Sequence, residues 1–493
     1  MNAQVKRLMV VVLIMILATM VSTTVTQFFS AEKLNQDTRN TRAIYNAQGR
    51  PRGPIIVQGT PIASSTALPS KGTNKRYQRT YTAKDGMYSQ ITGFYSLQGM
   101  STGLEQTEND VFLGQAPSQL LARLSQMAKG SEQTGGAIEL TIDPAVQQAA
   151  WKALGGRRGA AVALDPSTGA ILAAVSSPSY DPNPLASLDQ SVAAKAMKDL
   201  QADPQRPMDN RAFGGHRFSP GSSFKLITAA AMLSSGQYTP DTRVNAPTEI
   251  SLPQTTKTLS NIDHESCAGG RPTLRTAFAL SCNTPFAQAG MALGQDQMEA
   301  MAEAFGFNKS FTMPLAVTAS VYPQKSGKDA DVMAPPQLAY SAIGQYNDQA
   351  TPMQMAMVAA TIANGGVEMK PYLVAHELDA KLNPTSTTSP TRMGEPISQS
   401  VANQLKDMMT AVVNEGTGTT AQINNVQVAG KTGTAEVGDS GRADGWFVGF
   451  APADDPKIAF AVAIEGDQDG IRALHGAQVA PVARQMILAR LSH

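Results

Sequence analysis

The chain has 493 residues, and its 40 lysines and arginines against 39 aspartates and glutamates leave a formal net charge of +1. This balance gives no support to a nucleic-acid-binding surface, and the length indicates more than one domain. The two cysteines form no Cys-x-x-Cys pair and the five histidines form no His-Glu-x-x-His motif. We therefore expect neither a metal site nor a cofactor.

The N-terminus predicts a membrane anchor. Lys6 and Arg7 precede an uncharged, mainly apolar run over residues 8–29, close to the roughly 20 residues that cross a bilayer. A cleaved signal peptide is the alternative, but the run is long for one, and Phe29-Ser30-Ala31 does not offer small residues at both cleavage positions. The basic pair predicts a cytoplasmic tail over residues 1–7, with the rest of the chain on the outer face of the cell membrane.

Residues 30–135 are polar and rich in Gly, Thr, Gln and Arg, with short strand-like patches at 54–57 and 88–91. They predict a strand-containing pedestal domain, and a plain spacer between membrane and enzyme is the alternative. The flexible, polar residues 130–136 mark the expected boundary, after which residues 136–493 form the second domain.

The second domain opens with an alternating strand at 138–142 and a helix that Asp143 and Pro144 begin. A β-hairpin follows, and the middle of the domain is helical. Strands return near the end, which predicts an α+β fold whose sheet is built from both ends of the domain. The expected elements are strands at 160–164, 170–175, 426–429, 446–451 and 458–465, helices at 187–200 and 296–305, and loops at 326–336 and 381–391.

Three short motifs, each weak alone, carry the chemistry: Ser222-x-x-Lys225, Ser281-Cys282-Asn283 and Lys431-Thr432-Gly433-Thr434. A serine hydroxyl needs a base within hydrogen-bond reach to act as a nucleophile. Pro220-Gly221 should start a helix, which puts Ser222 at its N-terminus and Lys225 on the same face. A second cation and exclusion of water would lower the proton affinity of Lys225 enough to make it a base.

In this order, the three motifs resemble the signatures of the penicillin-binding protein transpeptidase domain. No segment before residue 136 is long or patterned enough for a glycosyltransferase domain, and residues 52–55 resemble the start of the N-terminal module of class B members. The resemblance implies a serine β-lactamase-like fold, with an antiparallel sheet flanked by helices and a helical subdomain. It extends over residues 162–172, 177–183, 210–212, 343–345, 351–356 and 441–452.

The resemblance implies a D,D-transpeptidase that cross-links peptidoglycan stem peptides and is acylated by β-lactams. Ser222 would be acylated by the penultimate D-Ala, with Lys225 as base. Ser281 would bridge Lys225 and Lys431 and pass a proton to the leaving amine. Asn283 would hold the substrate amide and orient Lys225, while Lys431 would keep the cleft electropositive.

The remaining implied roles lie on the third motif. Thr432 and Thr434 would bind the terminal carboxylate of the substrate, and the backbone NH groups of Ser222 and Thr434 would form the oxyanion hole. Gly433 would leave room for substrate to lie along the strand.

Structural alternatives exist for several of these residues. Ser281 alone would cap a helix, and Asn283 would end a loop. His216, six residues before Ser222, is interpreted as structural. Gly430-Lys431-Thr432 resembles the end of a phosphate-binding loop, but Asn425 stands where that loop requires glycine.

Cys267 and Cys282 are expected to form a disulfide, because paired cysteines outside the membrane favour one. The bridge would close a loop of about 15 residues and contribute about 3 kcal/mol against unfolding. Two buried free thiols are the alternative.

Other functions share part of this pattern. A membrane-bound β-lactam sensor should have several membrane segments, whereas one is predicted here. A β-lactamase needs a carboxylate to activate water, and no glutamate lies between Glu303 and Glu368, while Asp329, Asp331 and Asp348 lie in predicted loops. A D,D-carboxypeptidase would use the same catalytic residues and stays open. Family analogy suggests a glycan polymerase and proteins of cell division or cell shape as partners.

Overall fold

The computed structural model describes residues 3–30, 49–69, 75–97, 100–120, 123, 124, 126, 134–262, 264–327, 330–438, 441–466, 468 and 470–492. Most of the predicted linker at 130–136, and Asp329, lie outside this part of the chain.

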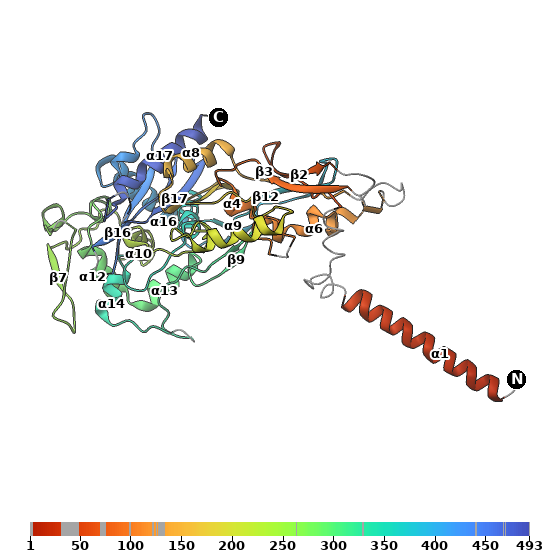
Figure 1. The fold of residues 1–493 in the computed structure, drawn as a ribbon. Coiled ribbons are helices and arrows are strands. Elements are labelled where there is room, and N and C mark those ends of the chain that lie inside the picture. Colours follow the sequence, from red (N-terminus) through yellow and green to blue (C-terminus); the bar gives the residue numbers. More distant parts are fainter. Residues whose placement is uncertain are drawn as a thin grey trace.

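The N-terminal helix α1 (Ala3–Thr24) continues through one π-helical turn, Val25–Phe29. Residues Gln4–Gln27 are long and apolar enough to cross a membrane, and none of their most apolar window is buried inside the structure (Figure 1). This helix has the length and composition of the predicted anchor.

A six-stranded sheet, in the order β13-β12-β4-β1-β2-β3, forms the pedestal domain. β1 pairs with β4 in parallel, and the other neighbours are antiparallel. The strands are β1 (Ile55–Val57), β2 (Thr60–Leu68), β3 (Arg76–Tyr81), β4 (Ala137–Leu140), β12 (Val374–Leu378) and β13 (Pro384–Thr387). Short helices pack beside them: α4 (Ser89–Thr92), α5 (Gly103–Thr107), α6 (Asn109–Phe112) and a 3-10 turn (Pro117–Gln119).

The pedestal sheet crosses the boundary expected at residue 135. β4 follows that boundary, and β12 and β13 come from far beyond it, so Figure 1 shows β12 near β2 and β3. The loop predicted at 381–391 was therefore wrong, because β13 occupies its centre. The strand predicted at 88–91 was also wrong: Gly86 and Gly93, both at positive φ, flank the helical turn α4.

A second, five-stranded antiparallel sheet has the order β15-β16-β17-β5-β6. Its first hairpin comes from the start of the domain and its other three strands from the end, which confirms the predicted assembly from both ends. The strands are β5 (Gly159–Leu164), β6 (Ile171–Ser177), β15 (Ala429–Val437), β16 (Arg442–Ala451) and β17 (Ile458–Ile464). β15 begins at the last residue of the strand predicted at 426–429.

Helices cover both faces of this sheet, so nearly every residue of β5, β6, β16 and β17 is buried. α8 (Pro144–Leu154) and α17 (Gly476–Leu491) pack in one apolar cluster, and α15 (Pro352–Ala363) and α16 (Gln399–Glu415) pack in the other. Asp143 caps α8 as predicted, since its side chain accepts hydrogen bonds from two backbone NH groups of the first turn.

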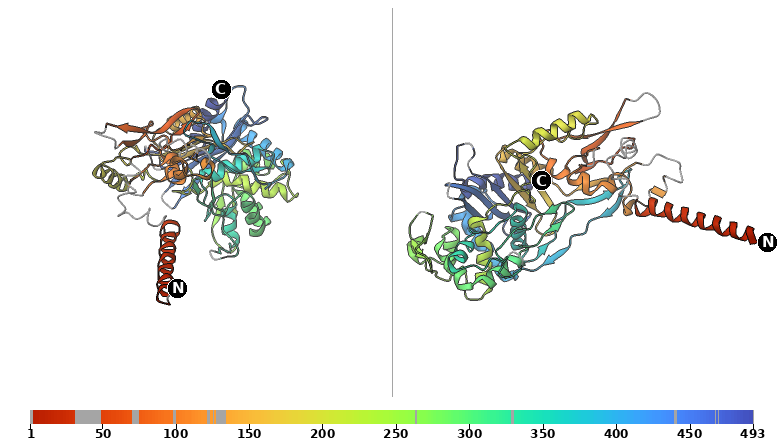
Figure 2. Two further views of the ribbon diagram at one scale, coloured as in Figure 1. Left: turned by 90° about the vertical axis from the view of Figure 1, so that its right-hand side faces the viewer. Right: turned by 60° about the horizontal axis from the view of Figure 1, so that its bottom comes forward.

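A helical subdomain lies beside β15. It contains α10 (Lys225–Ser234), α11 (Leu274–Ala279), α12 (Thr284–Leu293), α13 (Gln295–Ala304) and α14 (Pro335–Ser341), with the hairpin β7 (Glu249–Ser251) and β8 (Thr258–Ser260). The predicted helix at 187–200 corresponds to α9 (Gln190–Ala202), and the one at 296–305 corresponds to α13. Helix α9 has no buried residue and lies on the surface in Figure 2.

The remaining elements are short. They are the strands β9 (Phe311–Thr312), β10 (Ala316–Val317), β11 (Glu368–Met369) and β14 (Arg392–Gly394), and the 3-10 turns η3 (Gly221–Phe224), η4 (Cys267–Gly270) and η5 (Thr419–Ala421).

Candidate active site

The turn that carries Ser222 is packed tightly against the edge strand of the five-stranded sheet. Gly221 has φ +50°, and a Cβ at this position would lie 2.4 Å from the carbonyl oxygen of Thr434. The Gly221 NH donates to the carbonyl of Gly344 at 2.8 Å. A side chain at position 221 would therefore displace the serine.

The predicted helix start differs in detail. Residues Gly221–Phe224 form the 3-10 turn η3, and the α-helix α10 begins only at Lys225. Three residues make one 3-10 turn, so Ser222 and Lys225 still share a face. Ser222 is only 6% exposed, yet it lines two neighbouring cavities.

Lys225 is completely buried, and its Nζ has two neutral acceptors. It donates to the carbonyl oxygen of Ser281 at 2.7 Å and to Oδ1 of Asn283 at 2.8 Å, and it lies 5.6 Å from the ring centroid of Phe286. Burial, and then the charge of Lys431, hold the pKa of Lys225 well below its usual value of 10.5. The structure thus gives Lys225 the low proton affinity that a base requires.

Lys431 is the second fully buried lysine of the site. Its Nζ donates to Oγ of Ser281 at 2.8 Å and to the carbonyl of Thr432 at 2.9 Å, over the ring of Phe278. Burial lowers the pKa of Lys431 to about 7. Within the described residues, neither buried lysine forms an ion pair with a carboxylate.

Ser281 contacts both lysines, each through a different group. Its hydroxyl accepts from Lys431, whereas its backbone carbonyl accepts from Lys225. Its backbone lies in the left-handed region at φ +58°, a conformation that costs a residue other than glycine about 1–3 kcal/mol. Ser281 therefore links the two lysines through its hydroxyl and its backbone carbonyl.

The third motif lies on strand β15. Because side chains alternate along a strand, its residues point to two opposite faces of the sheet. Thr432 and Thr434 line the cavity beside Ser222, where Thr432 bonds to Thr417 and Thr434 lies 3.4 Å from Nδ1 of His475. At position 433 a Cβ would lie 2.8 Å from Cβ of Trp446.

Gly433 has a packing reason of its own, and the room for substrate stays a prediction. A Cβ atom at position 433 would collide with Trp446. It would also lie 3.0 Å from the carbonyl oxygen of Pro220 and 3.2 Å from the backbone nitrogen of Ser223. Gly433 lets β15 approach the nucleophile turn.

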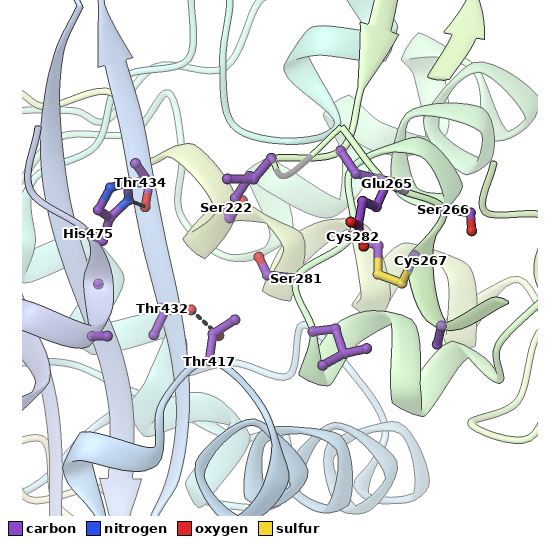
Figure 3. A pocket seen from close by; sticks show the side chains of 16 residues that line it. Ser222, Glu265, Ser266, Cys267, Ser281, Cys282, Thr417, Thr432, Thr434 and His475 are labelled. Atoms are coloured by element: carbon purple, nitrogen blue, oxygen red, sulfur yellow. Dashed lines mark hydrogen bonds between the residues drawn. A yellow bond between two sulfur atoms is a disulfide. The ribbon is translucent and has the colours of Figure 1, made fainter. Parts of the chain in front are cut away.

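Two cavities meet at Ser222. The first, of about 530 Å³, is lined by Ser281, the two cysteines, Thr417 and Thr432 (Figure 3). The second, of about 560 Å³, continues along β15 past Asn283 and Glu436. Ser222 and Thr434 line both, so the two residues expected to form the oxyanion hole flank the junction.

Sequence reasoning missed several residues of the site. Asn261 arrives from β8 and lies in no motif, yet its Oδ1 accepts from the backbone NH groups of Asn283 and Thr284 at 2.9 and 3.1 Å. Thr417 and His475 approach from the ends of α16 and α17. No sequence motif marks any of these three residues. Each belongs to the site only because the fold brings it next to the motif residues.

Cys267 and Cys282 form a disulfide in the structure, with Cα atoms 6.1 Å apart. Both sulfur-bearing residues line the first cavity (Figure 3). The covalent link thus lies in the wall of the active site, directly beside Ser281.

The carboxylates considered from sequence lie elsewhere. Asp348 is fully buried and accepts from Ser341 Oγ at 2.7 Å, while Asp331 accepts from Tyr346 and Asn347. Among the described residues, the carboxylates that line the two cavities are Glu265 and Glu436, both exposed and both outside the interval from 303 to 368.

His216 packs edge-on against Phe218 and does not line either cavity that Ser222 lines, as its structural interpretation predicts. The described residues contain no group of three or more His, Cys, Asp or Glu side chains that could hold a metal.

Comparison with known proteins agrees with this geometry over the whole chain. Residues 159–488 match the model of the penicillin binding protein transpeptidase domain, and residues 52–138 match that of the penicillin binding protein A dimerisation domain. The peptidoglycan D,D-transpeptidase PbpA of Mycolicibacterium smegmatis is 42% identical over 501 residues, covering 100% of this chain and 99% of that protein.

Solved structures give the same result. The crystal structure of PBPA from Mycobacterium tuberculosis is 38% identical, with a TM-score of 0.82 over 90% of this chain and 100% of that chain. Its ceftriaxone acyl-enzyme complex has a TM-score of 0.84 at 38% identity, over 91% of this chain and 100% of that one. The resemblance to class B members, and among them to actinobacterial penicillin-binding protein A, is thereby confirmed. The chain belongs to the class B penicillin-binding proteins.

Proposed function

We propose that this chain is a serine D,D-transpeptidase that cross-links peptidoglycan stem peptides and is inhibited by β-lactams. The observation that carries the proposal is the buried cluster of Lys225, Ser281 and Lys431 behind Ser222, where both lysines donate only to neutral acceptors. Such a cluster supplies a neutral amine beside a hydroxyl, which is what a serine nucleophile needs without histidine.

In the acylation step, neutral Lys225 accepts the proton of Ser222, whose Oγ attacks the carbonyl carbon of the penultimate D-Ala. The backbone NH groups of Ser222 and Thr434 donate to the oxyanion. The C–N bond then breaks, and the proton taken up by Lys225 reaches the leaving D-Ala amine through the Ser281 hydroxyl, which gives up one proton and takes up another while Lys431 holds it. Asn283 orients Lys225 through the hydrogen bond between them.

Substrate position follows from the cavity walls. Thr432 and Thr434 donate hydroxyl hydrogen bonds to the terminal carboxylate, and Lys431 supports them electrostatically from behind the strand. The backbone of β15, which packs closely through Gly433, provides an edge along which the peptide extends.

The proposal includes location and partners. The helix α1 anchors the chain in the cell membrane, with Lys6 and Arg7 on the cytoplasmic side and the catalytic domain outside. There the enzyme would act with a membrane glycan polymerase and with proteins of cell division or elongation, by analogy with its family.

A D,D-carboxypeptidase would use the same residues and differ in transferring the acyl group to water. The relatives named D,D-transpeptidase favour transfer to an amine. Product analysis with a stem-peptide donor and an amine acceptor separates the two: a cross-linked or amidated product supports the transpeptidase, and release of D-Ala with hydrolysed donor alone contradicts it.

Intact-mass measurement after incubation with penicillin G tests the nucleophile. We expect a stable adduct on the wild-type chain and none on Ser222→Ala, with Ser223→Ala as a control that keeps its adduct. An adduct on Ser222→Ala, or rapid loss of the wild-type adduct by hydrolysis, would contradict the proposal.

A further inference from the structure

The first cavity has two walls of different chemistry. On one side, β15 and the start of α17 present Thr432, Thr434 and His475, and on the other the segment that ends at Cys267 presents Glu265 and the disulfide (Figure 3). Ser222 and Ser281 lie between the walls. Of the described residues that line this cavity, Glu265 alone carries a carboxylate side chain, and none carries a lysine or arginine side chain.

This cavity is the side of Ser222 from which the acceptor arrives, an assignment that rests on the proposed function. The leaving D-Ala bears the carboxylate that Thr432 and Thr434 hold, so it departs into the cavity that contains Thr432. The acceptor amine takes the same place relative to the acyl carbon, because amide formation is the reverse of amide cleavage at that atom. The second cavity, toward Glu436, then holds the rest of the donor.

The wall that bears Glu265 is fixed to the catalytic motif at two points. Asn261 Nδ2 donates to the carbonyl of Glu265 at 2.9 Å, while its Oδ1 accepts from the NH of Asn283. Cys267 is bonded to Cys282, which lies between Ser281 and Asn283. The backbone of Glu265 therefore has a set position relative to the catalytic motif, and its side chain extends from that fixed point.

An acceptor amine is an ammonium ion at neutral pH, and the protonated form of buried Lys431 repels it. A carboxylate on the opposite wall offsets that repulsion and attracts the cation. Among the described residues, Glu265 forms no ion pair that would neutralise it. We propose that Glu265 binds the ammonium group of the incoming acceptor and selects cationic amines over water.

Glu265 acts before the chemical step. The docked ammonium loses a proton, its nitrogen attacks the acyl carbon, a C–N bond forms and the bond from that carbon to Ser222 Oγ breaks. Of the three ammonium protons, one stays on the amide nitrogen, one returns to Ser222 Oγ and one is released to solvent. Replacing Glu265 should consequently raise the half-saturating acceptor concentration and leave the rate at saturating acceptor unchanged.

The test measures transfer and hydrolysis together on the full chain in detergent micelles. A stem-peptide donor ending in D-Ala-D-Ala is supplied with increasing D-alaninamide, a cationic amine without a carboxylate. For Glu265→Gln we expect the half-saturating D-alaninamide concentration to rise about fivefold, the effect of one unit charge at about 4 Å in water. Glu265→Lys should raise it further, and added salt should weaken the wild-type preference but not that of Glu265→Gln.

Three controls keep the outcomes distinct. Asp241→Asn, an exposed change just beyond the C-terminal end of α10, should leave the half-saturating concentration unchanged, and Glu436→Gln tests the second cavity. Penicillin acylation of Glu265→Gln reports whether the nucleophile is intact. If Glu436→Gln raises the acceptor requirement as much as Glu265→Gln, the side assigned to the acceptor is wrong.

Failure of the inference differs from failure of the proposed function. Normal acylation of Glu265→Gln with an unchanged acceptor requirement overturns the role of Glu265 alone. An equal loss of transfer and hydrolysis also overturns it, because it would make Glu265 a base. Absence of any transfer by the wild-type chain overturns the proposed transpeptidase itself.

Discussion

The described part of the chain contains a buried pair of cations in each domain. In the catalytic domain, Lys225 and Lys431 lie behind Ser222. In the pedestal, Arg52 and Arg79 are buried to a similar degree. The pairs differ in what surrounds them, and the difference separates a structural cluster from a catalytic one.

The arginine cluster is neutralised from within. Glu105, fully buried, accepts from both guanidinium groups and from the hydroxyl of Tyr81, and Arg52 also donates to Asn109 at 2.8 Å. Arginine keeps its proton in proteins, so both guanidinium groups stay charged at every pH that the fold experiences. A buried charge with a paired carboxylate suits a fixed joint between strands and short helices.

The lysine cluster lacks such a carboxylate among the described residues. Its acceptors are a hydroxyl, an amide and backbone carbonyls, so burial acts on the charged form with little compensation. Lysine, unlike arginine, responds by releasing its proton. The burial of Lys225 thus lowers its pKa, as its proposed role of base requires.

The largest expected effect is the loss of the base. Lys225→Ala should lower the rate of acylation by penicillin about 10³-fold, within the range usual for removal of a general base. The rate is measured by intact mass over time. Lys195→Ala, at an exposed lysine on α9, should acylate at the wild-type rate.

A chemical rescue sharpens this prediction. Lys225→Cys can be alkylated to carry an aminoethyl group, and the native cysteines are protected while their disulfide stays intact. Partial return of acylation on alkylation would show that a titratable amine is required. Full acylation of unmodified Lys225→Ala would mean that the lysine cluster is as structural as the arginine cluster.

The second effect falls on the pedestal. Glu105→Gln should lower the free energy of unfolding by about 3–5 kcal/mol, because both arginines lose their buried partner. Urea unfolding measures the loss, and Glu139→Gln on β4 of the same sheet is the control, with about 0.5 kcal/mol or less expected.

Acylation distinguishes the two clusters in the same variant. Below the urea transition, Glu105→Gln should still form the penicillin adduct at close to the wild-type rate. A variant with normal stability but slow acylation would contradict the assignment of the arginine cluster to structure alone.

The lysine cluster can be predicted from the sequence, whereas the arginine cluster cannot. The lysines lie in short motifs whose order and spacing identify them, and Ser222 and Lys225 are close in the chain, so local geometry brings them together. Arg52 and Glu105 are 53 residues apart, and the resemblance of residues 52–55 to an N-terminal module does not pair Arg52 with Glu105. Their meeting depends on the packing of the pedestal sheet, which sequence periodicity does not specify.

The same limit applies to the fold. Long patterned segments such as α8, β17 and α13 were predicted closely because a cap or a repeating apolar position marks them. β12 and β13 join the pedestal sheet from beyond residue 370. The segment that contains β13 is rich in threonine and includes a proline, so its composition alone resembles that of a loop. Long-range strand pairing, like the positions of Asn261 and Glu265, is set by tertiary contacts.

The third effect concerns how each cluster is held in place. Ion pairs hold the arginine cluster, whereas the disulfide lies next to Ser281 in the lysine cluster. The denatured, unreduced protein should contain no free thiol. Cys267→Ser should lower the free energy of unfolding by about 3 kcal/mol, the chain-entropy value for a loop of about 15 residues.

The disulfide prediction fails if two thiols are counted in the unreduced wild-type chain. It is also contradicted if Cys267→Ser unfolds at the wild-type urea concentration. Glu105→Gln should keep the disulfide, so the two losses of stability should add, since the residues belong to separate domains.

The smallest effect is a pH slope that only the lysine cluster can produce. Burial lowers the pKa of Lys431 to about 7, against about 10.5 in the unfolded chain, so unfolding takes up one proton between these values. The unfolded state binds more protons there, and the free energy of unfolding should therefore rise with pH, by about 1.4 kcal/mol per unit for this group.

Other groups titrate in the same range, so the slope is isolated by difference. Lys431→Met removes the titrating amine and keeps an apolar side chain of similar length. The unfolding free energies of this variant are subtracted from those of wild type between pH 7 and 9. The difference should rise with pH, because it contains the contribution of Lys431. At pH 7 the variant should be at least as stable as wild type, because an uncompensated buried charge has been replaced by an apolar side chain. Its acylation should nevertheless be impaired. Arg79→Met in the pedestal should give no such slope, since arginine stays protonated in both states. A flat difference for Lys431→Met would mean that Lys431 keeps its proton as firmly as the arginines do, and the contrast between the two clusters would then rest on Lys225 alone.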